Sequence, residues 1–286
     1  MITQRICELL EELKMILFDS HSHIDDKAYQ DDLDEVLERA EKENVQAIMI
    51  AGIDVDSSLR AAELASGHTG IVTSVGIHPH EAQNWSAEKI EKLVNIAEKY
   101  SCVKAWGEIG LDFNRMFSPV KDQEACFIAQ LEAAQDLDLP LICHERDSSG
   151  RFYELLKRFG PESRKGVIHC FSGTQKEMFS YLDLGYHIGI TGIVTHKKRG
   201  EYLRKLVPMI PEDRILIETD CPYLTPSPVR NRIRRNEPCF VKLVLLKLAE
   251  VRNTDPDRLS QVIFDNTRKL YGIQRLPKRA VFAPDT

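Results

Sequence analysis

Several features that mark large classes of proteins are missing from this sequence. Its 286 residues contain no uncharged apolar run of about 18 residues, so no segment is predicted to span a bilayer. Basic residues are not in excess, because 38 Lys and Arg stand against 44 Asp and Glu. This balance excludes a general nucleic-acid coat protein, although an enzyme with a local basic patch remains compatible with it. The seven cysteines include no CxxC pair, which favours a reduced, cytoplasmic protein over a disulfide scaffold.

The sequence also predicts neither an export signal nor an internal linker. Residues 1–14 interrupt their apolar positions with five charged residues, so we expect a short amphipathic helix instead of a signal peptide. No Ser/Gly-rich stretch or change of composition divides residues 15–272, which predicts a single domain. Residues 273–286 carry mixed charge and two prolines, and we expect a loose C-terminal tail.

What the sequence does contain is a repeated alternation of short apolar runs and charged, helix-like stretches. The eight apolar runs are residues 15–23, 45–53, 71–80, 102–113, 139–147, 166–173, 186–193 and 214–224. Apolar residues at helical spacing predict helices over 29–44, 86–100 and 121–138, the second with Ser86 as its N-cap. Eight βα units in about 250 residues predict a (β/α)8 TIM barrel. A doubly wound open sheet is the alternative, weakened because no GxGxxG follows the first run.

Histidines and acids gather at the carboxyl ends of the predicted strands, which form the active-site face of such a barrel. Six of the nine histidines lie there: His21, His23, His78, His80, His144 and His169. The acids Glu108 and Asp220 close the fourth and eighth runs. Any one of these residues could be a packed core residue or half of an ion pair. Together they predict a site for divalent metal ions, and the mixed donors do not select among Zn, Mn, Ni, Co and Mg.

Three cysteines, Cys143, Cys170 and Cys221, adjoin the proposed ligands. Strand alternation turns neighbouring side chains to opposite faces of a sheet, so we expect these thiols to point toward the helices. We therefore interpret them as buried packing residues and not as ligands or nucleophiles.

Basic and aromatic residues follow the last strands and suggest a substrate surface. The segment 225–238 contains Arg230, Arg232, Arg234 and Arg235, and residues 196–199 read His-Lys-Lys-Arg. An arginine run is often only a solvated loop, but at a barrel mouth it would collect phosphates. Arg146 could clamp a phosphate directly. Tyr223, Phe171 and Trp85 could stack on nucleobases or could simply be packing residues.

The motifs resemble the TatD family of metal-dependent deoxyribonucleases. They are FDSHSHID (18–25), GIHPH (76–80), GEIGLD (107–112), HERD (144–147), HCFSG (169–173), ETDCPYL (218–224) and RNEP (235–238). The resemblance implies two divalent ions, one held by His21, His23 and Asp220 and the other by His144 and His169, with Glu108 bridging them. The sequence departs from the family pattern in its 14-residue N-terminal extension, in Asn114-Arg115 and in the longer arginine-rich stretch before RNEP.

The resemblance implies a metal-dependent phosphodiesterase that trims single-stranded DNA from an end, for example in DNA repair, and we expect it to be a monomer. In this hypothesis the two ions supply hydroxide, Asp220 orients the nucleophile and takes its proton, and Arg146 offsets the developing charge. His78 contacts the phosphate or the leaving oxygen, and Tyr223 and Arg235 contact the substrate. Alternatives are a barrel hydrolase of small amides, lactones or organophosphates, an esterase of aminoacyl-RNA, and a non-catalytic binding barrel.

Overall fold

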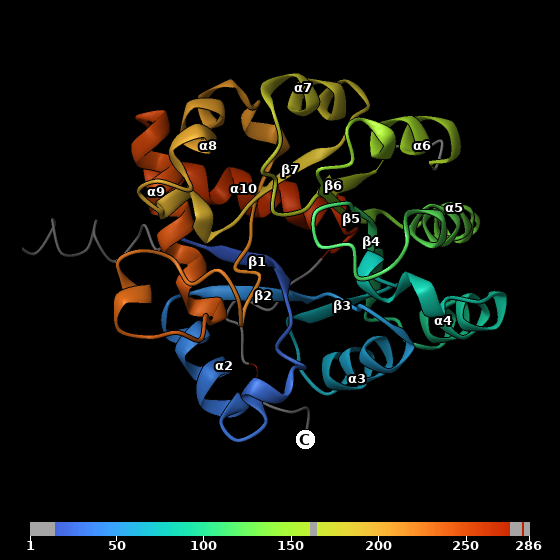
Figure 1. Ribbon diagram of the computed structural model, residues 1–286. Coiled ribbons are helices and arrows are strands. Elements are labelled where there is room, and N and C mark those ends of the chain that lie inside the picture. The colour runs from blue at the N-terminus through green and yellow to red at the C-terminus, as the bar shows by residue number, and fades with distance from the viewer. Residues whose placement is uncertain (1–14, 161–164, 275–281, 283–286) are drawn as a thin grey trace, which may run out of the picture.

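The computed structural model describes residues 15–160, 165–274 and 282. Within them, eight parallel strands form one sheet, and each strand pairs with the next along the chain (Figure 1). The strands are β1 Leu17–Ser22, β2 Val45–Ile50, β3 Ile71–Val75, β4 Val103–Asp112, β5 Leu141–Arg146, β6 Gly166–Ile168, β7 His187–Ile190 and β8 Ile215–Ile217. This order confirms the predicted (β/α)8 barrel and excludes a doubly wound sheet, whose strand order reverses at a switch point.

The barrel closes between the first and last strands, just beyond their carboxyl ends. Ser22 forms a parallel bridge with Cys221. The His23 amide donates to the Cys221 carbonyl at 2.8 Å, and the Asp220 amide donates to the His21 carbonyl at 3.0 Å. The segments that close the barrel are therefore the segments that carry three of the predicted metal ligands.

A ring of helices surrounds the sheet (Figure 1). They are α2 Leu33–Lys42, α3 Val55–Ser66, α4 Ala87–Lys99, α5 Val120–Asp136, α6 Arg151–Phe159, α7 Gln175–Asp183, α8 Glu201–Leu206, α9 Val241–Arg252 and α10 Pro256–Leu270. The three helices expected from periodicity correspond to α2, α4 and α5. Ser86 caps α4 as predicted, since its side chain accepts the Lys89 amide at 3.3 Å.

The barrel interior is filled from its amino-terminal end. Phe18, Met49 and Leu216 belong to a cluster of buried residues that also contains Phe264 and Tyr271, and the Phe18 ring lies 6.2 Å from both aromatic rings. Because α10 thereby covers one end of the barrel, the carboxyl ends of the strands are left as the open face.

The predicted runs extend beyond the strands mainly at this open face. β6 ends at Ile168 and β8 at Ile217, although the apolar runs continue to residues 173 and 224. Positive φ angles at Cys170 (47°) and Asp220 (56°) turn the backbone away from the sheet ladder there. The expected helix over 1–14 and nearly all of the expected tail over 273–286 lie outside the described residues. No described helix combines the length and apolarity that a bilayer crossing needs.

Candidate metal centre

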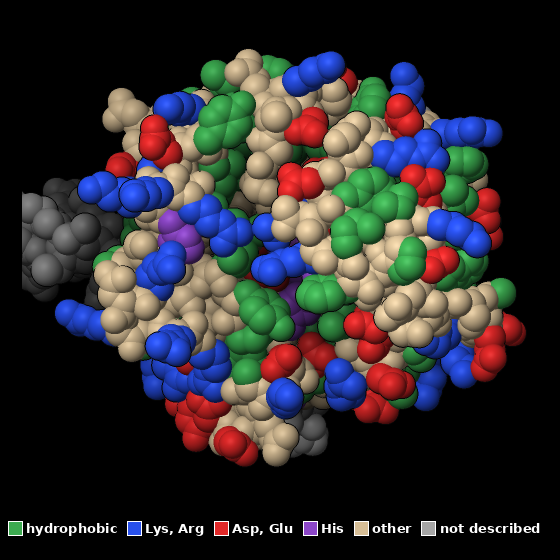
Figure 2. Space-filling model, viewed as in Figure 1, with side chains coloured by type: hydrophobic (Ala, Val, Ile, Leu, Met, Phe, Trp, Pro, Cys, Tyr) green, Lys and Arg blue, Asp and Glu red, His purple; other side chains and the backbone are tan. Residues whose placement is uncertain are grey.

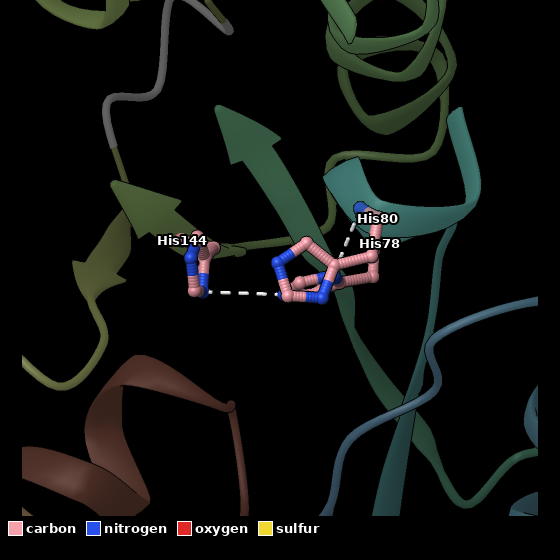
Figure 3. Close-up of side chains that lie close together, drawn as sticks. All are labelled: His78, His80 and His144. Carbon is pink, nitrogen blue, oxygen red and sulfur yellow. Dashed lines mark hydrogen bonds between the residues drawn. The ribbon is translucent and has the colours of Figure 1, made fainter. Parts of the chain in front are cut away.

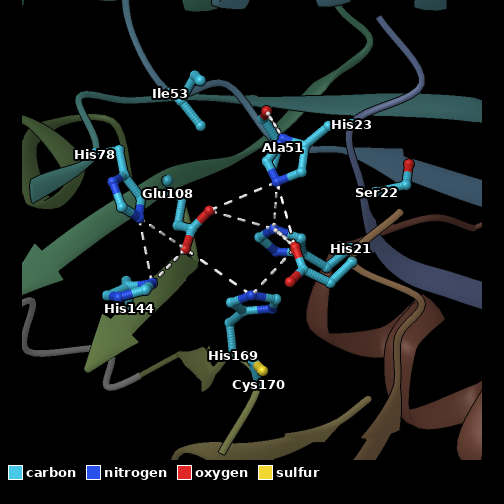
Figure 4. A network of polar contacts seen from close by, with 12 residues as sticks. His21, Ser22, His23, Ala51, Ile53, His78, Glu108, His144, His169 and Cys170 are labelled. Atoms are coloured by element: carbon cyan, nitrogen blue, oxygen red, sulfur yellow. Dashed lines mark hydrogen bonds and ion pairs between the residues drawn. The ribbon is translucent and has the colours of Figure 1, made fainter. Parts of the chain in front are cut away.

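The six predicted metal ligands converge on one point at the open end of the barrel. They are His21 and His23 from β1 and its end, Glu108 from β4, His144 from β5, and His169 and Asp220 from the segments after β6 and β8. Figure 4 shows the Glu108 carboxylate in the middle of this group, with histidines on either side of it. Glu108 is only 3% exposed, so the arrangement is largely shielded from solvent.

Glu108 directs its two carboxylate oxygens toward two different sets of histidines. Oε2 lies 3.3 Å from His21 Nε2 and 3.9 Å from His23 Nε2. Oε1 lies 2.8 Å from His144 Nδ1 and 3.9 Å from His169 Nε2. A carboxylate placed in this way has the geometry of a group that bridges two cations.

Asp220 faces the same cluster from the other side. Its Oδ1 lies 3.5 Å from His23 Nε2, 3.7 Å from His169 Nε2 and 3.8 Å from His21 Nε2. Two ligand atoms that share a tetrahedral ion at about 2.1 Å are separated by about 3.4 Å. The three distances from Asp220 Oδ1 are therefore too long for good hydrogen bonds, and they are close to the distance between two atoms that bind a common ion.

Three of the four ligand histidines have a hydrogen-bond acceptor for the ring nitrogen that points away from the cluster, whereas His21 Nδ1 is buried without a partner among the described residues. His23 Nδ1 lies 3.2 Å from the Ala51 carbonyl, and His169 Nδ1 lies 2.9 Å from Glu218 Oε2. His144 Nε2 lies 3.3 Å from Asp112 Oδ2. If each outer nitrogen carries the proton, each inner nitrogen keeps its lone pair for a cation, which is the arrangement that orients histidine ligands in metal sites.

Glu218 and Asp112 are the residues of this outer layer that sequence reasoning missed. The buried Glu218 carboxylate accepts from His169 Nδ1 and from the Cys170 amide, both at 2.9 Å. Glycine at position 189 makes room for it, because a Cβ there would lie 2.2 Å from Glu218 Oε1. Asp112 ends the GEIGLD motif, and its position four residues after Glu108 was the available signal.

The electrostatics of the cluster fit a cation site. Burial alone would raise the pKa of Glu108, yet the surrounding histidines hold it well below its ordinary value. Burial lowers the pKa of His169, but Glu218 and Glu108 outweigh it and raise that pKa to about 10. Among the described residues, every ion-pair partner of Glu108 and Asp220 is a histidine. No lysine or arginine of the described ranges therefore neutralises the two carboxylates.

Ligand atoms fall into three close groups: His21–His23–Glu108, His21–His169–Asp220 and His78–His80–His144. The first two overlap with the ligand set that the family resemblance implies. The third, shown in Figure 3, joins His144 to His78 instead of to His169. His78 Nδ1 accepts the His80 amide at 3.1 Å, so its Nε2 carries the proton of the neutral ring and acts as a donor. His78 therefore does not suit a metal ligand in this geometry.

A sequence model of the TatD related DNase family matches residues 18–272. The chain belongs to this family. It is 40% identical over 260 residues to a Rahnella protein named 3′-5′ ssDNA/RNA exonuclease TatD, an alignment that covers 90% of this chain and 98% of the relative. A TatD homolog of Escherichia coli K12 has a TM-score of 0.82 at 28% identity and covers 90% of this chain and 98% of its own. A TatD family hydrolase of Entamoeba histolytica has a TM-score of 0.82 at 26% identity and covers 91% and 99%.

Membership of the TatD family confirms the resemblance drawn from the motifs. It also confirms the prediction of an enzyme that hydrolyses phosphodiester bonds. A hydrolase of small amides or lactones, an aminoacyl-RNA esterase and a non-catalytic barrel are not favoured.

The three residues predicted to contact the substrate, Arg146, Tyr223 and Arg235, have different surroundings in the structure. Tyr223 is 57% exposed beside the cluster, with its ring 6.2 Å from that of His23. Arg146 ends β5 at the mouth and forms no ion pair with a described residue. Arg235 instead makes a two-pronged ion pair with Asp32 at 2.6 and 2.7 Å and stacks on Tyr29. Because carboxylates already engage its guanidinium, Arg235 is not part of the substrate surface that we propose.

The cysteines lie where packing residues lie. Cys143 and Cys221 are fully buried in the layer between the barrel and the helices. Burial raises the pKa of both thiols well above its usual range. Cys170 is half-buried, and its Sγ lies 3.5 Å from the Thr191 hydroxyl. These positions agree with the interpretation of the three thiols as packing residues.

Proposed function

We propose that this protein is a metal-dependent 3′–5′ exonuclease that acts on single-stranded DNA or RNA. The observation that carries the proposal is the Glu108 carboxylate, whose two oxygens face two separate sets of imidazole nitrogens. The polarity and the single-stranded substrate follow the name of the Rahnella relative. Exposed cationic residues at the open end of the barrel independently support a nucleic-acid substrate.

The described residues fit two divalent ions. His21, His23 and Asp220 would hold one, His144 and His169 the other, and Glu108 would contribute one oxygen to each. When bound, such ions lower the pKa of water toward neutrality and offset the charge that grows on phosphoryl oxygens. Three of the four imidazoles have an acceptor for an outward-facing proton, and no lysine or arginine of the described residues pairs with Glu108 or Asp220.

The protein's own residues would do the rest of the chemistry. Asp220 lies at the rim of the cluster with 16% of its side chain exposed, so it can accept the proton of the attacking water. His78 Nε2 lies 3.4 Å from Glu108 Oε1 and is a donor, so it can hydrogen-bond a phosphoryl or leaving oxygen. Arg146, two residues beyond His144, would bind the phosphate next to the one that is cleaved.

A basic rim would guide the nucleic-acid backbone to this centre. It consists of six exposed cationic side chains: Lys197, Lys198, Arg199, Arg230, Arg232 and Arg234. A hydrogen bond of 3.1 Å between the Arg230 guanidinium and His196 Nδ1 joins the two segments that carry them. Figure 2 shows Lys and Arg side chains gathered above and to the left of the central histidines. Binding through such a rim weakens as salt concentration rises.

The test is cleavage of end-labelled single-stranded DNA and RNA by metal-stripped protein supplied with Mg²⁺, Mn²⁺ or Zn²⁺. We expect a ladder that shortens from the 3′ end, and we expect Glu108→Gln to lower kcat/KM by at least about 100-fold. Glu124→Gln is the control, because Glu124 forms a surface ion pair with Arg151 on α5 and α6. Cleavage that is independent of metal, or retained in Glu108→Gln, would contradict the proposal.

A further inference from the structure

Phe117, in the loop between β4 and α5, is the most exposed of the large hydrophobic side chains in the described ranges, at 61%. Its ring stands edge-on to His80, with 4.7 Å between centroids and 81° between planes. Met116 beside it is 44% exposed. Phe117 and Met116 thus place two adjacent exposed apolar side chains at the edge of the histidine cluster.

The exposure of Phe117 does not come from a loose loop. Ser118, which is fully buried, donates from its hydroxyl to the His80 carbonyl at 2.8 Å and accepts the Gln83 amide at 3.0 Å. Asp112 Oδ1 accepts the amides of Asn114 and Arg115 at 3.0 and 2.8 Å. The backbone on both sides of Phe117 is therefore held in place, so binding a ligand would not require ordering of this loop.

Tyr223 occupies a matching position at the other side of the centre. It is second in exposure among the same set of side chains, at 57%, and its ring lies edge-on to His23. Ring contacts lead from Phe117 through His80 and His78 to His144, and Glu108 connects His144 to the His21–His23 side. Figure 2 shows hydrophobic side chains on both sides of the histidine patch at the mouth.

We propose that Phe117 forms a nucleobase subsite, so that an unpaired base stacks on Phe117 at one side of the scissile phosphate and the neighbouring base on Tyr223 at the other. The subsite rests on the proposed nuclease function and explains its preference for single strands. Bases that are paired and stacked on each other in a duplex cannot separate to reach two platforms. Stacking tolerates every base, because each presents a π-face.

The binding test uses metal-stripped wild-type protein and single-stranded oligonucleotides with 2-aminopurine at the terminal or the penultimate 3′ position. Stacking on an aromatic ring quenches the fluorescence of this base. We expect quenching at both positions with wild-type protein, loss at one position with Phe117→Ala, and loss at the other with Tyr223→Ala. Phe117→Trp should retain the quenching. Equal quenching with wild-type and Phe117→Ala protein at both positions would overturn the subsite.

The kinetic test compares the intact oligonucleotide with oligonucleotides that carry an abasic residue at either position. Phe117→Ala should raise KM for the intact strand about 5- to 100-fold with little change in kcat. It should add no further loss on the abasic strand that lacks the base bound by Phe117. Phe179→Ala is the matched control, since Phe179 is 40% exposed and lies on α7, which carries none of the proposed ligands. A purely structural role for Phe117 would give the same loss on all substrates and would overturn the proposal.

The experiments distinguish failure of the proposed nuclease function from failure of the proposed nucleobase subsite. A wild-type protein that binds and quenches the probes but cleaves nothing with any metal would refute the nuclease function and leave the base subsite standing. Wild-type cleavage with an unaffected Phe117→Ala variant would refute the subsite alone.

Discussion

Glu218 lies behind His169, fully buried, and its Oε2 accepts both the His169 Nδ1 proton and the Cys170 amide at 2.9 Å. Replacing it with glutamine keeps an oxygen that can accept these bonds but removes the negative charge. We expect Glu218→Gln to weaken metal binding about 10-fold and Glu218→Ala about 100-fold, the range found when partners of ligating histidines are lost. Competition with a chromophoric chelator measures both affinities.

A surface carboxylate provides the comparison for Glu218. Glu154→Gln, on the exposed side of α6 in an ion pair with Arg151, should bind metal like the wild type. If Glu218→Ala binds metal as tightly as Glu154→Gln, the orientation of His169 does not depend on Glu218, and the outer layer proposed for the centre is incorrect.

At the scale of the element, the pairing of β4 with β5 decides whether Glu108 meets His144. Gly110 pairs with His144 in this ladder and has φ of +143°, and a Cβ there would lie 1.9 Å from the His144 carbonyl oxygen. The two strands would have to separate where the carboxylate and the imidazole meet. We expect Gly110→Ala to lower the free energy of unfolding by about 2–4 kcal/mol and to weaken metal binding. Urea unfolding and chelator competition measure the two effects.

Substitutions at two other glycines distinguish backbone strain from steric clash as the cause of the lost stability. Gly150 has φ of +86°, but a Cβ added to it would meet nothing within 4 Å, so Gly150→Ala tests backbone strain alone, at about 1 kcal/mol. Gly67 ends α3 with φ of −90°, and the nearest atom to its Cβ would be 3.7 Å away, so Gly67→Ala should be close to neutral. A Gly110→Ala variant no less stable than Gly150→Ala would show that β4 and β5 accommodate the side chain.

At the scale of the whole molecule, the fold and the inner ligands follow from the sequence because both rest on regular patterns. Short apolar runs that alternate with stretches of helical spacing predict βα units, and parallel strands bring their carboxyl ends to one face, where His21 and Asp220 meet from opposite ends of the chain. The residues that form hydrogen bonds with the ligand histidines were not predicted from the sequence. Glu218 and Asp112 are acids whose role depends on which ring nitrogen they face, and Arg235 depends on a tertiary ion pair with Asp32. The spacing of Asp112 from Glu108 places both acids on one face of β4, but no spacing rule tells which ring nitrogen an acid faces.

Stability in acid is a property of the whole molecule to which His187, at the start of β7, contributes. Its Nδ1 donates to the Gly166 carbonyl at 3.2 Å, and burial lowers its pKa to about 4. The unfolded chain therefore binds a proton more readily than the native protein between pH 6.5 and 4, so this contribution to stability is complete above pH 6.5 and is lost as the pH falls through that window. In His187→Asn the amide can keep the hydrogen bond without titrating.

We expect the free energy of unfolding of His187→Asn to fall less than that of the wild type between pH 7 and 4, by about 1–2 kcal/mol. Urea unfolding at both pH values measures the difference, and parallel losses in the two proteins would mean that His187 is protonated without cost in the folded state.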